Sequence, residues 1–240
     1  MELIPLIMLS PSLILIAAAV IPAVYLLIFV YRQDSLEKES GKLLFKLVAF
    51  GAASTALAEY AETLGIAALP YVSVPGSSRY YFLLYFLVVG LAEEGFKYLL
   101  MRACTWRNRE FNCLFDGVVY AVFTSLGFAL WENISYVISY GLATALARAV
   151  TAVPGHACFG VFMGAYYGAA KRYEMRGEAD KSKRCRILSV AVPMLLHGAY
   201  DYLASSDEIS QLVFVVFIAV MFFVAYRLVK KIAAHDEYIA

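Results

Sequence analysis

The chain of 240 residues is 62% hydrophobic and only 16% charged, with a mean hydropathy of +0.70. Soluble domains are about 45–50% apolar and about 25% charged, so this chain has more apolar surface than its own interior can hold. Its net charge of +1 excludes strong electrostatic attraction to nucleic acid. Its four cysteines have no paired spacing and predict neither a disulfide framework nor a zinc ribbon. The composition predicts an integral membrane protein.

Apolar stretches close to the roughly 20 residues that cross a bilayer recur along the whole chain. We therefore expect an all-α, polytopic helical bundle of about seven transmembrane helices, forming a single domain over residues 1–240. The first stretch has no basic segment before it and no clear cleavage site, which favours a retained helix over a signal peptide. The expected spans are 3–31, 43–69, 80–103, 114–139, 143–170, 187–204 and 209–230.

Basic residues are confined to alternate connections between these spans. Seventeen of the 20 Lys and Arg residues lie in the first, third and fifth connections and in the C-terminal tail, and the longest basic run is 171–186. The opposite connections hold Arg79 alone, beside the acidic Asp207 and Glu208. Because positive residues stay on the cytoplasmic side, we expect the N-terminus outside and the C-terminus inside.

The third span carries Glu93, Glu94 and Lys97. On a helix the lysine is three residues from one carboxylate and four from the other, so it can reach either. One cation cannot neutralise two anions, which indicates that one carboxylate can take up a proton as a general base does. The alternative is an internal salt bridge that only pins this helix to a neighbour.

Later spans carry further polar groups. Asp116 opens the fourth span, where it would cap the helix. Glu132 and Asn133 lie deeper in the same span. They would be either site groups or hydrogen-bond partners of a neighbouring helix. His156 follows Pro154, whose missing backbone donor frees a carbonyl one turn earlier. It is either a site group or a satisfied packing histidine.

The sixth span carries His197 and, four residues later, Asp201. They share a helix face, so the carboxylate can hold the imidazole tautomer. At 1.5 Å per residue, the depths of Glu93, His156 and His197 differ by roughly 10 Å, which helix tilt can absorb. We expect these groups to meet in one cavity near the middle of the membrane. Glu59 and Glu62 of the second span receive no role from the sequence.

In this order the motifs resemble the PrsW family of membrane proteases, over residues 80–204. That family is similar in turn to the type II CAAX prenyl proteases, which have a Glu-Glu pair followed by two histidine motifs. Two departures are Glu132, where the related proteases have the histidine of a Phe-x-x-x-His motif, and Asp201, where they often have asparagine. The matching motifs are Glu93-Glu94-x-x-Lys97, Phe115-Asp116-Gly117, Leu126-Gly127-Phe128, Glu132-Asn133, Arg148, Pro154-x-His156, Met163-Gly164 and His197-Gly-x-Tyr200-Asp201.

The resemblance implies a peptidase of a prokaryotic plasma membrane. It would make the first cut in a single-pass membrane protein such as an anti-sigma factor, with the catalytic core at about 80–204 and peripheral helices at 3–31, 43–69 and 209–230. From the groups themselves, Glu93 or Glu94 would deprotonate a water molecule that attacks the scissile carbonyl. Further groups would assist this step or stabilise the oxyanion. The expected catalytic residues are Glu93, Glu94, Asn133, His156, His197 and Asp201, supported by Lys97, Asp116 and Glu132.

Two alternatives remain open. Glu93, Glu94, His156 and His197 would also make a Zn²⁺ site, although the chain has no His-Glu-x-x-His motif, so a mechanism without a cofactor is preferred. The same groups would suit a proton-coupled transporter. Against a transporter, seven spans do not divide into two equal repeats. The expected partners are the single-pass membrane substrate and the lipid bilayer, with no nucleic acid.

Overall fold

The computed structural model describes residues 11–206 and 211–239, with side chains described from Ile16. The predicted all-α fold class is confirmed: these residues form helices and no strand, with a single isolated bridge between Cys113 and Tyr238. The elements are α1 (Pro11–Gln33), α2 (Gly41–Ala68), η1 (Leu69–Tyr71), α3 (Ser78–Phe82), η2 (Leu83–Gly90), α4 (Leu91–Thr105), α5 (Asp116–Tyr140), α6 (Leu142–Val150), α7 (Ala152–Met175), α8 (Ala179–Ala204) and α9 (Gln211–Ala234).

Six helical stretches of the described chain are long and apolar enough to cross a membrane. The predicted span 80–103 is not among them. It is helical but divided into α3, η2 and α4, and it carries Glu93, Glu94 and Lys97, which lower its apolar character. Residues 3–10 and 209–210 of the predicted spans lie outside the described residues. The six stretches are Ile16–Gln33, Gly41–Tyr71, Asp116–Tyr140, Leu142–Met175, Ala179–Ala204 and Gln211–Ala234.

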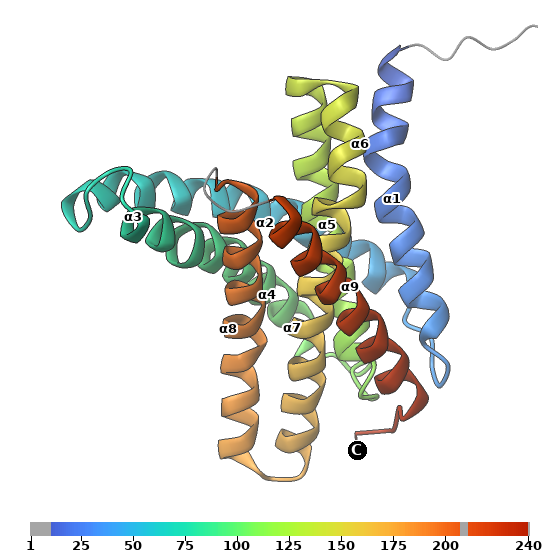
Figure 1. Cartoon of the computed structure of the whole chain (residues 1–240). Helices are drawn as coiled ribbons and strands as arrows, with labels where there is room; N and C mark the ends of the chain where they lie inside the picture. The colour runs from blue at the N-terminus through green and yellow to red at the C-terminus, as the bar shows by residue number, and fades with distance from the viewer. Residues whose placement is uncertain (1–10, 207–210, 240) are drawn as a thin grey trace, which may run out of the picture.

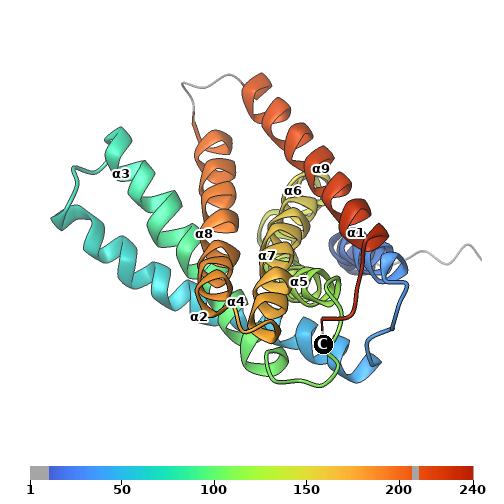
Figure 2. The ribbon, with the colours of Figure 1, turned by 90° about the horizontal axis from the view of Figure 1, so that it is seen from below.

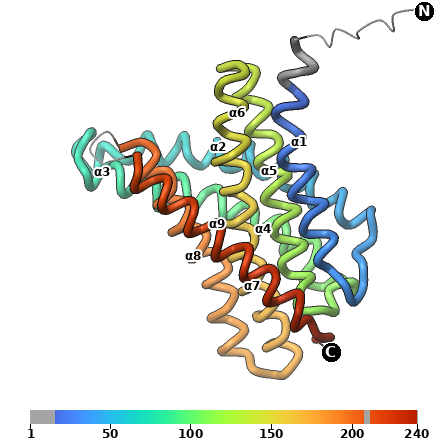
Figure 3. The backbone as a smooth tube through the Cα atoms, turned by 45° about the vertical axis from the view of Figure 1, so that its right-hand side comes forward, coloured from blue at the N-terminus to red at the C-terminus, as the bar shows by residue number. Residues whose placement is uncertain are grey.

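Helix α5 is the centre of the bundle and is buried over most of its length. It packs against α7 and α2, and α1 lies along its upper part beside α6 (Figures 1 and 3). Glycines permit the closest approaches. A Cβ on Gly164 of α7 would lie 2.4 Å from the carbonyl oxygen of Gly117, and one on Gly127 would lie 2.2 Å from that of Val48 in α2. Small residues at such crossings bring helix backbones together, as is typical of membrane bundles.

Two helical hairpins complete the fold. Helices α7 and α8 run antiparallel, and their turn lies near the same end of the molecule as the C-terminus (Figure 1). Helix α2 forms the other hairpin with α3, η2 and α4 (Figure 2), and α4 packs against α8 and α5. Segment η2 is a π-helix that ends at Gly90, three residues before Glu93. Such widened turns are frequent at functional sites.

The break predicted at Pro154 lies slightly earlier. Helix α6 ends at Val150 and α7 begins at Ala152, so Thr151 separates them. Pro154 lies in the first turn of α7, where a missing backbone donor removes no helical hydrogen bond. The break still places His156 within the second turn of a new helix, where α7 faces α5 and α8.

Candidate active site

Glu93, Glu94 and Lys97 meet on the buried face of α4, as the helical spacing predicts. The ammonium nitrogen of Lys97 lies 3.1 Å from Oε2 of Glu93 and 2.7 Å from Oε1 of Glu94. The side chains of Lys97 and Glu94 are fully buried, whereas that of Glu93 is 8% exposed. Nζ also lies 3.9 Å from the centroid of the Phe128 ring of α5. The lysine therefore ties both carboxylates to the core of the bundle.

His156 of α7 contacts both Lys97 and Glu132. Its Nδ1 lies 3.1 Å from Nζ of Lys97, and its Nε2 lies 2.9 Å from Oε2 of Glu132 on α5. A lysine ammonium only donates hydrogen bonds, so Nδ1 accepts and Nε2 carries the proton that it donates to Glu132. Both ring nitrogens are thus used within the protein, and the predicted site residue Glu132 orients the ring.

His197 of α8 contacts the carboxylates of Glu93 and Glu94. Its Nδ1 lies 3.0 Å from Oε1 of Glu94 and 3.8 Å from Oε2 of Glu93. Its Nε2 lies 3.4 Å from Oδ2 of Asp201, within ion-pair distance but longer than an ordinary hydrogen bond. The ring stacks on Phe159 of α7, with 4.7 Å between the ring centroids. The predicted pairing of His197 with Asp201 is present in the structure.

Arg148 of α6 contacts the site through Glu132, a link that sequence reasoning did not find. Its terminal nitrogen donates to Oε2 of Glu132 at 2.8 Å, and its Nε donates to Oδ1 of Asn133 at 3.0 Å. Nδ2 of Asn133 donates to the carbonyl oxygen of Ala19 in α1 at 3.0 Å. Asn133 is therefore engaged at both ends by the protein. The available signal was Arg148 itself, a cation within a span, which requires a partner.

Asp116 lies apart from these groups. It is buried at the start of α5, where Oδ2 accepts hydrogen bonds from the backbone nitrogens of Asn112 at 2.9 Å and Cys113 at 2.7 Å. It therefore braces the connection between α4 and α5 rather than capping the helix as predicted. A cap would instead accept from the second or third helical residue.

The converging side chains line a polar cavity of about 300 Å³. Glu62, for which no role was predicted, lies in the wall of this cavity. Glu93 lines this cavity and Glu94 does not. The lining residues are Glu62, Tyr85, Val89, Glu93, Glu132, Tyr136, Arg148, Ala152, His156, Phe159, His197, Tyr200, Asp201 and Ser205.

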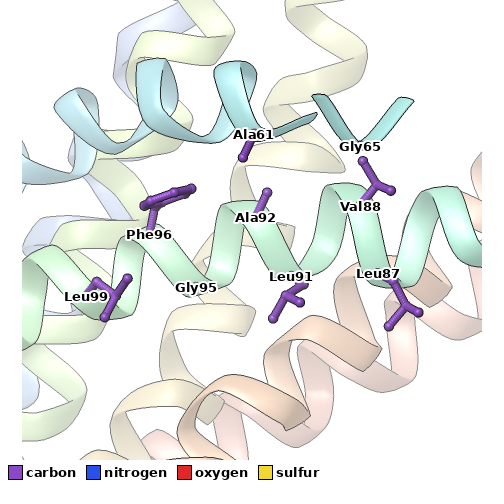
Figure 4. A pocket seen from close by; sticks show the side chains of 9 residues that line it. All are labelled: Ala61, Gly65, Leu87, Val88, Leu91, Ala92, Gly95, Phe96 and Leu99. Carbon is purple, nitrogen blue, oxygen red and sulfur yellow. The ribbon is translucent and has the colours of Figure 1, made fainter. Parts of the chain in front are cut away.

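A separate pocket of about 390 Å³ lies between α2 and the η2–α4 segment. Ala92 and Phe96 point toward α2, where Ala61 and Gly65 lie (Figure 4). Its lining has no ionisable residue, so it offers no acid–base chemistry. The polar cavity is therefore the candidate active site.

The candidate site also fits a metal ion. Glu93, Glu94, His156 and His197 each offer one ligand atom, and these atoms lie within 4.8 Å of one another. Within the described part of the chain, this is the one group of this kind. Carboxylate oxygens and imidazole nitrogens are ligands of Zn²⁺, and Oε2 of Glu94 is buried without a hydrogen-bond partner. The donor set therefore suits the ion.

Similarity to known proteins shows the family of this chain. Residues 39–227 match the PrsW-protease family, which is described as PrsW family intramembrane metalloprotease. The chain belongs to the PrsW family. One PrsW relative, Protease PrsW of Geobacillus kaustophilus, is 34% identical over 90% of this chain and 91% of its own length. Protease PrsW of Bacillus subtilis is 33% identical over 80% of this chain and 83% of its own length. No solved structure matches the chain.

Membership of the PrsW family makes the chain a membrane-embedded peptidase, as predicted. Its six apolar helical stretches and its bacterial PrsW relatives confirm a multi-pass protein of a prokaryotic plasma membrane. The similarity to type II CAAX prenyl proteases stays a prediction. The individual roles of the PrsW-like site residues are proposals, which follow.

Proposed function

We propose that this peptidase hydrolyses a peptide bond in or near the membrane segment of a single-pass membrane protein, through water activated by a glutamate. The observation that carries the proposal is the meeting of Glu93, Glu94, His156 and His197, from three helices, beside one polar cavity. Ionisable groups within membrane spans are costly to bury and therefore serve function. Two carboxylates and two imidazoles supply the acid–base groups that amide hydrolysis requires.

Glu93 is the general base in this proposal. It lines the cavity and its side chain is partly exposed, whereas Glu94 is fully buried. Glu93 removes a proton from water as the water oxygen attacks the scissile carbonyl, and it then gives this proton to the amide nitrogen, which leaves as an amine when the carbon–nitrogen bond breaks. Glu94 holds Lys97 and His197 in place, so it acts as a positioning residue.

His197 stabilises the developing oxyanion. Its Nε2 lies 3.4 Å from Asp201, too far for a strong hydrogen bond, and can donate to the substrate oxygen because both residues line the cavity. Donors aimed at the oxyanion are commonly the largest contribution to catalysis. His156, whose nitrogens are both engaged, positions Lys97 and Glu132. Asn133 positions Arg148.

A metal-dependent variant is the second candidate, because the donor set fits and the family is described as a metalloprotease. The ion would be held by Glu93, Glu94, His156 and His197. When bound, it would supply Lewis-acid activation of water or of the carbonyl. The shape of the cavity and the positions of Glu132, Arg148 and Asp201 would serve either variant.

The substrate class and the topology complete the proposal. The substrate in this proposal is an anti-sigma-factor-like protein with one membrane segment, and this enzyme makes the first cut in it. The sequence resemblance supports this substrate class. The basic run 171–186 covers the end of α7, the turn and the start of α8, and this turn lies near the end of the molecule where the C-terminus lies (Figure 1). Placing this end in the cytoplasm satisfies the positive-inside rule.

The decisive experiment uses purified protein in liposomes with a panel of tagged single-pass substrates. We expect Glu93→Gln, Glu94→Gln and His197→Ala to abolish cleavage, while Glu59→Gln, at an exposed glutamate of α2, leaves it intact. Cleavage that resists a chelator supports water activated by Glu93 alone. Cleavage that is lost with the chelator and restored by Zn²⁺ supports the metal-dependent variant. Wild-type activity in all three site variants would overturn the assignment, and proton flux without cleavage would favour a transporter.

A further inference from the structure

The ammonium group of Lys97 lies among three of the four candidate metal ligands. Nζ is 3.1 Å from Oε2 of Glu93, 2.7 Å from Oε1 of Glu94 and 3.1 Å from Nδ1 of His156. We propose that Lys97 is the built-in cation of this site, and that its ammonium and a metal ion held by these residues exclude each other. The inference rests on the site assigned above and adds a role for Lys97 that the proteolytic mechanism does not require.

The hydrogen bonds of Lys97 are complete without any further partner. A lysine ammonium has three protons, and three acceptors lie within hydrogen-bond distance. The Phe128 ring lies 3.9 Å from Nζ, and the side chain is fully buried. The group is therefore held on every side by protein, as a bound ion would be.

A metal ion would need the same atoms. Zn²⁺ binds carboxylate oxygen and imidazole nitrogen at about 2.0–2.2 Å. The four ligand atoms lie within 4.8 Å of one another, so an ion bound to all of them stands where Nζ now makes its contacts. Two cations so close together in a buried site repel each other strongly. Nδ1 of His156, moreover, cannot accept from the ammonium and bind a metal at once.

One arrangement would let both cations coexist. Oε2 of Glu94 is buried and has no hydrogen-bond partner, and Lys97 contacts the other oxygen of this carboxylate. An ion held only by Oε2 of Glu94, by His197 and by Oε1 of Glu93 would leave the lysine on Oε2 of Glu93 and Oε1 of Glu94. Binding of that kind would not depend on Lys97, so measuring metal affinity separates the two possibilities.

The test compares metal binding by the wild type and by Lys97→Met, a neutral side chain of similar length. Zn²⁺ affinity is measured by calorimetry and metal content by elemental analysis. The expected result is at least a tenfold tighter binding of Zn²⁺ by the variant, at one ion per chain, since removing the ammonium vacates the site. Co²⁺ should likewise bind the variant more tightly and give a visible spectrum of nitrogen and oxygen ligands.

Lys46→Met is the matched control. Lys46 of α2 is exposed and lies over the ring of Phe50, as Lys97 lies over Phe128, but it contacts no described carboxylate. Its replacement should leave metal affinity unchanged. Equal Zn²⁺ affinity in the wild type and in Lys97→Met, or tighter binding by the wild type, overturns the inference. None of these readouts uses cleavage, so failure of the proteolytic proposal would be seen separately.

Removing Lys97 leaves two buried carboxylates without their cation, so the variant is expected to melt at a lower temperature than the wild type when no metal is present. Zn²⁺ should raise the melting temperature of the variant more than that of the wild type, because only the variant gains a cation that it lacks. If Lys97→Met folds neither alone nor when produced with Zn²⁺, the metal cannot replace the lysine and the inference is wrong.

Discussion

Nε2 of His156 lies 2.9 Å from Oε2 of Glu132. This contact is an acid–imidazole pair that joins α5 to α7. The same carboxylate oxygen accepts from Arg148 at 2.8 Å. A continuous chain of contacts therefore runs from Arg148 through Glu132, His156 and Lys97 to the acidic pair on α4.

Glu132→Gln should reduce kcat by about 10–100-fold, the loss typical when a group that orients an active-site histidine is replaced. The amide keeps the size of the side chain but loses its charge, so the hydrogen bonds from His156 and Arg148 both weaken. Cleavage of a single-pass substrate under saturating conditions measures the effect. Glu59→Gln is the control, and full activity in Glu132→Gln would contradict the role given to this residue.

Arg148→Gln should act through Glu132 and therefore not add to its loss. We expect the Glu132→Gln/Arg148→Gln double variant to have nearly the kcat of Glu132→Gln alone, because residues in one hydrogen-bond network couple strongly. The measurement is a double-mutant cycle on kcat. Additive losses would show that the arginine serves the reaction by a separate contact.

Gly127→Ala should destabilise the bundle by about 1–3 kcal/mol, as overpacking does. The new methyl group would lie 2.2 Å from the carbonyl oxygen of Val48, so α2 and α5 must separate. Gly95→Ala is the matched control, since a Cβ at Gly95 of α4 has nothing within 4 Å. Alanine should stabilise that helix by about 0.5–1 kcal/mol. Thermal unfolding in detergent compares the two, and equal melting temperatures would contradict the close crossing.

Glu39→Gln should stabilise the protein at alkaline pH. Glu39 precedes α2, and its burial, followed by the nearby Asp116 carboxylate, raises its pKa above the ordinary range. The folded state then keeps a proton that the unfolded chain releases near pH 4.3, so the free energy of unfolding falls as pH rises above that value. Oε2 of Glu39 and Oδ1 of Asp116 are both buried without a donor, and the introduced amide supplies one.

We expect a gain of about 1–3 kcal/mol for Glu39→Gln at pH 8, the usual cost of a buried unsatisfied polar group. The gain should shrink toward pH 5, because the unfolded wild type then gains less free energy from releasing the Glu39 proton, while its folded state holds that proton at both pH values. Melting temperatures across this pH range measure it. Glu174→Gln, at an exposed position near the end of α7, should change little at any pH. A pH-independent difference between wild type and Glu39→Gln would refute the explanation.

The sequence by itself determined what depends on neighbours along the chain. Apolar length and composition predicted the six helical stretches of the described chain that are long and apolar enough to cross a membrane, because lipid requires helices of about 20 residues, but they also predicted a span at 80–103 that is not among these six. Helical spacing predicted the contacts of Lys97 with Glu93 and Glu94 and of His197 with Asp201, because residues three or four apart share a helix face.

Tertiary structure alone decided which helices bring their polar groups together. The contact of Lys97 with His156 spans 59 residues of sequence, and that of His197 with Glu94 spans 103. Helical periodicity carries no information on crossing angles, which follow from close approaches such as that of Gly127 to Val48. For the same reason the place of Glu62 in the cavity wall was not predictable. Asp116 was assigned to the site from its motif alone, and packing set it at the far end of α5.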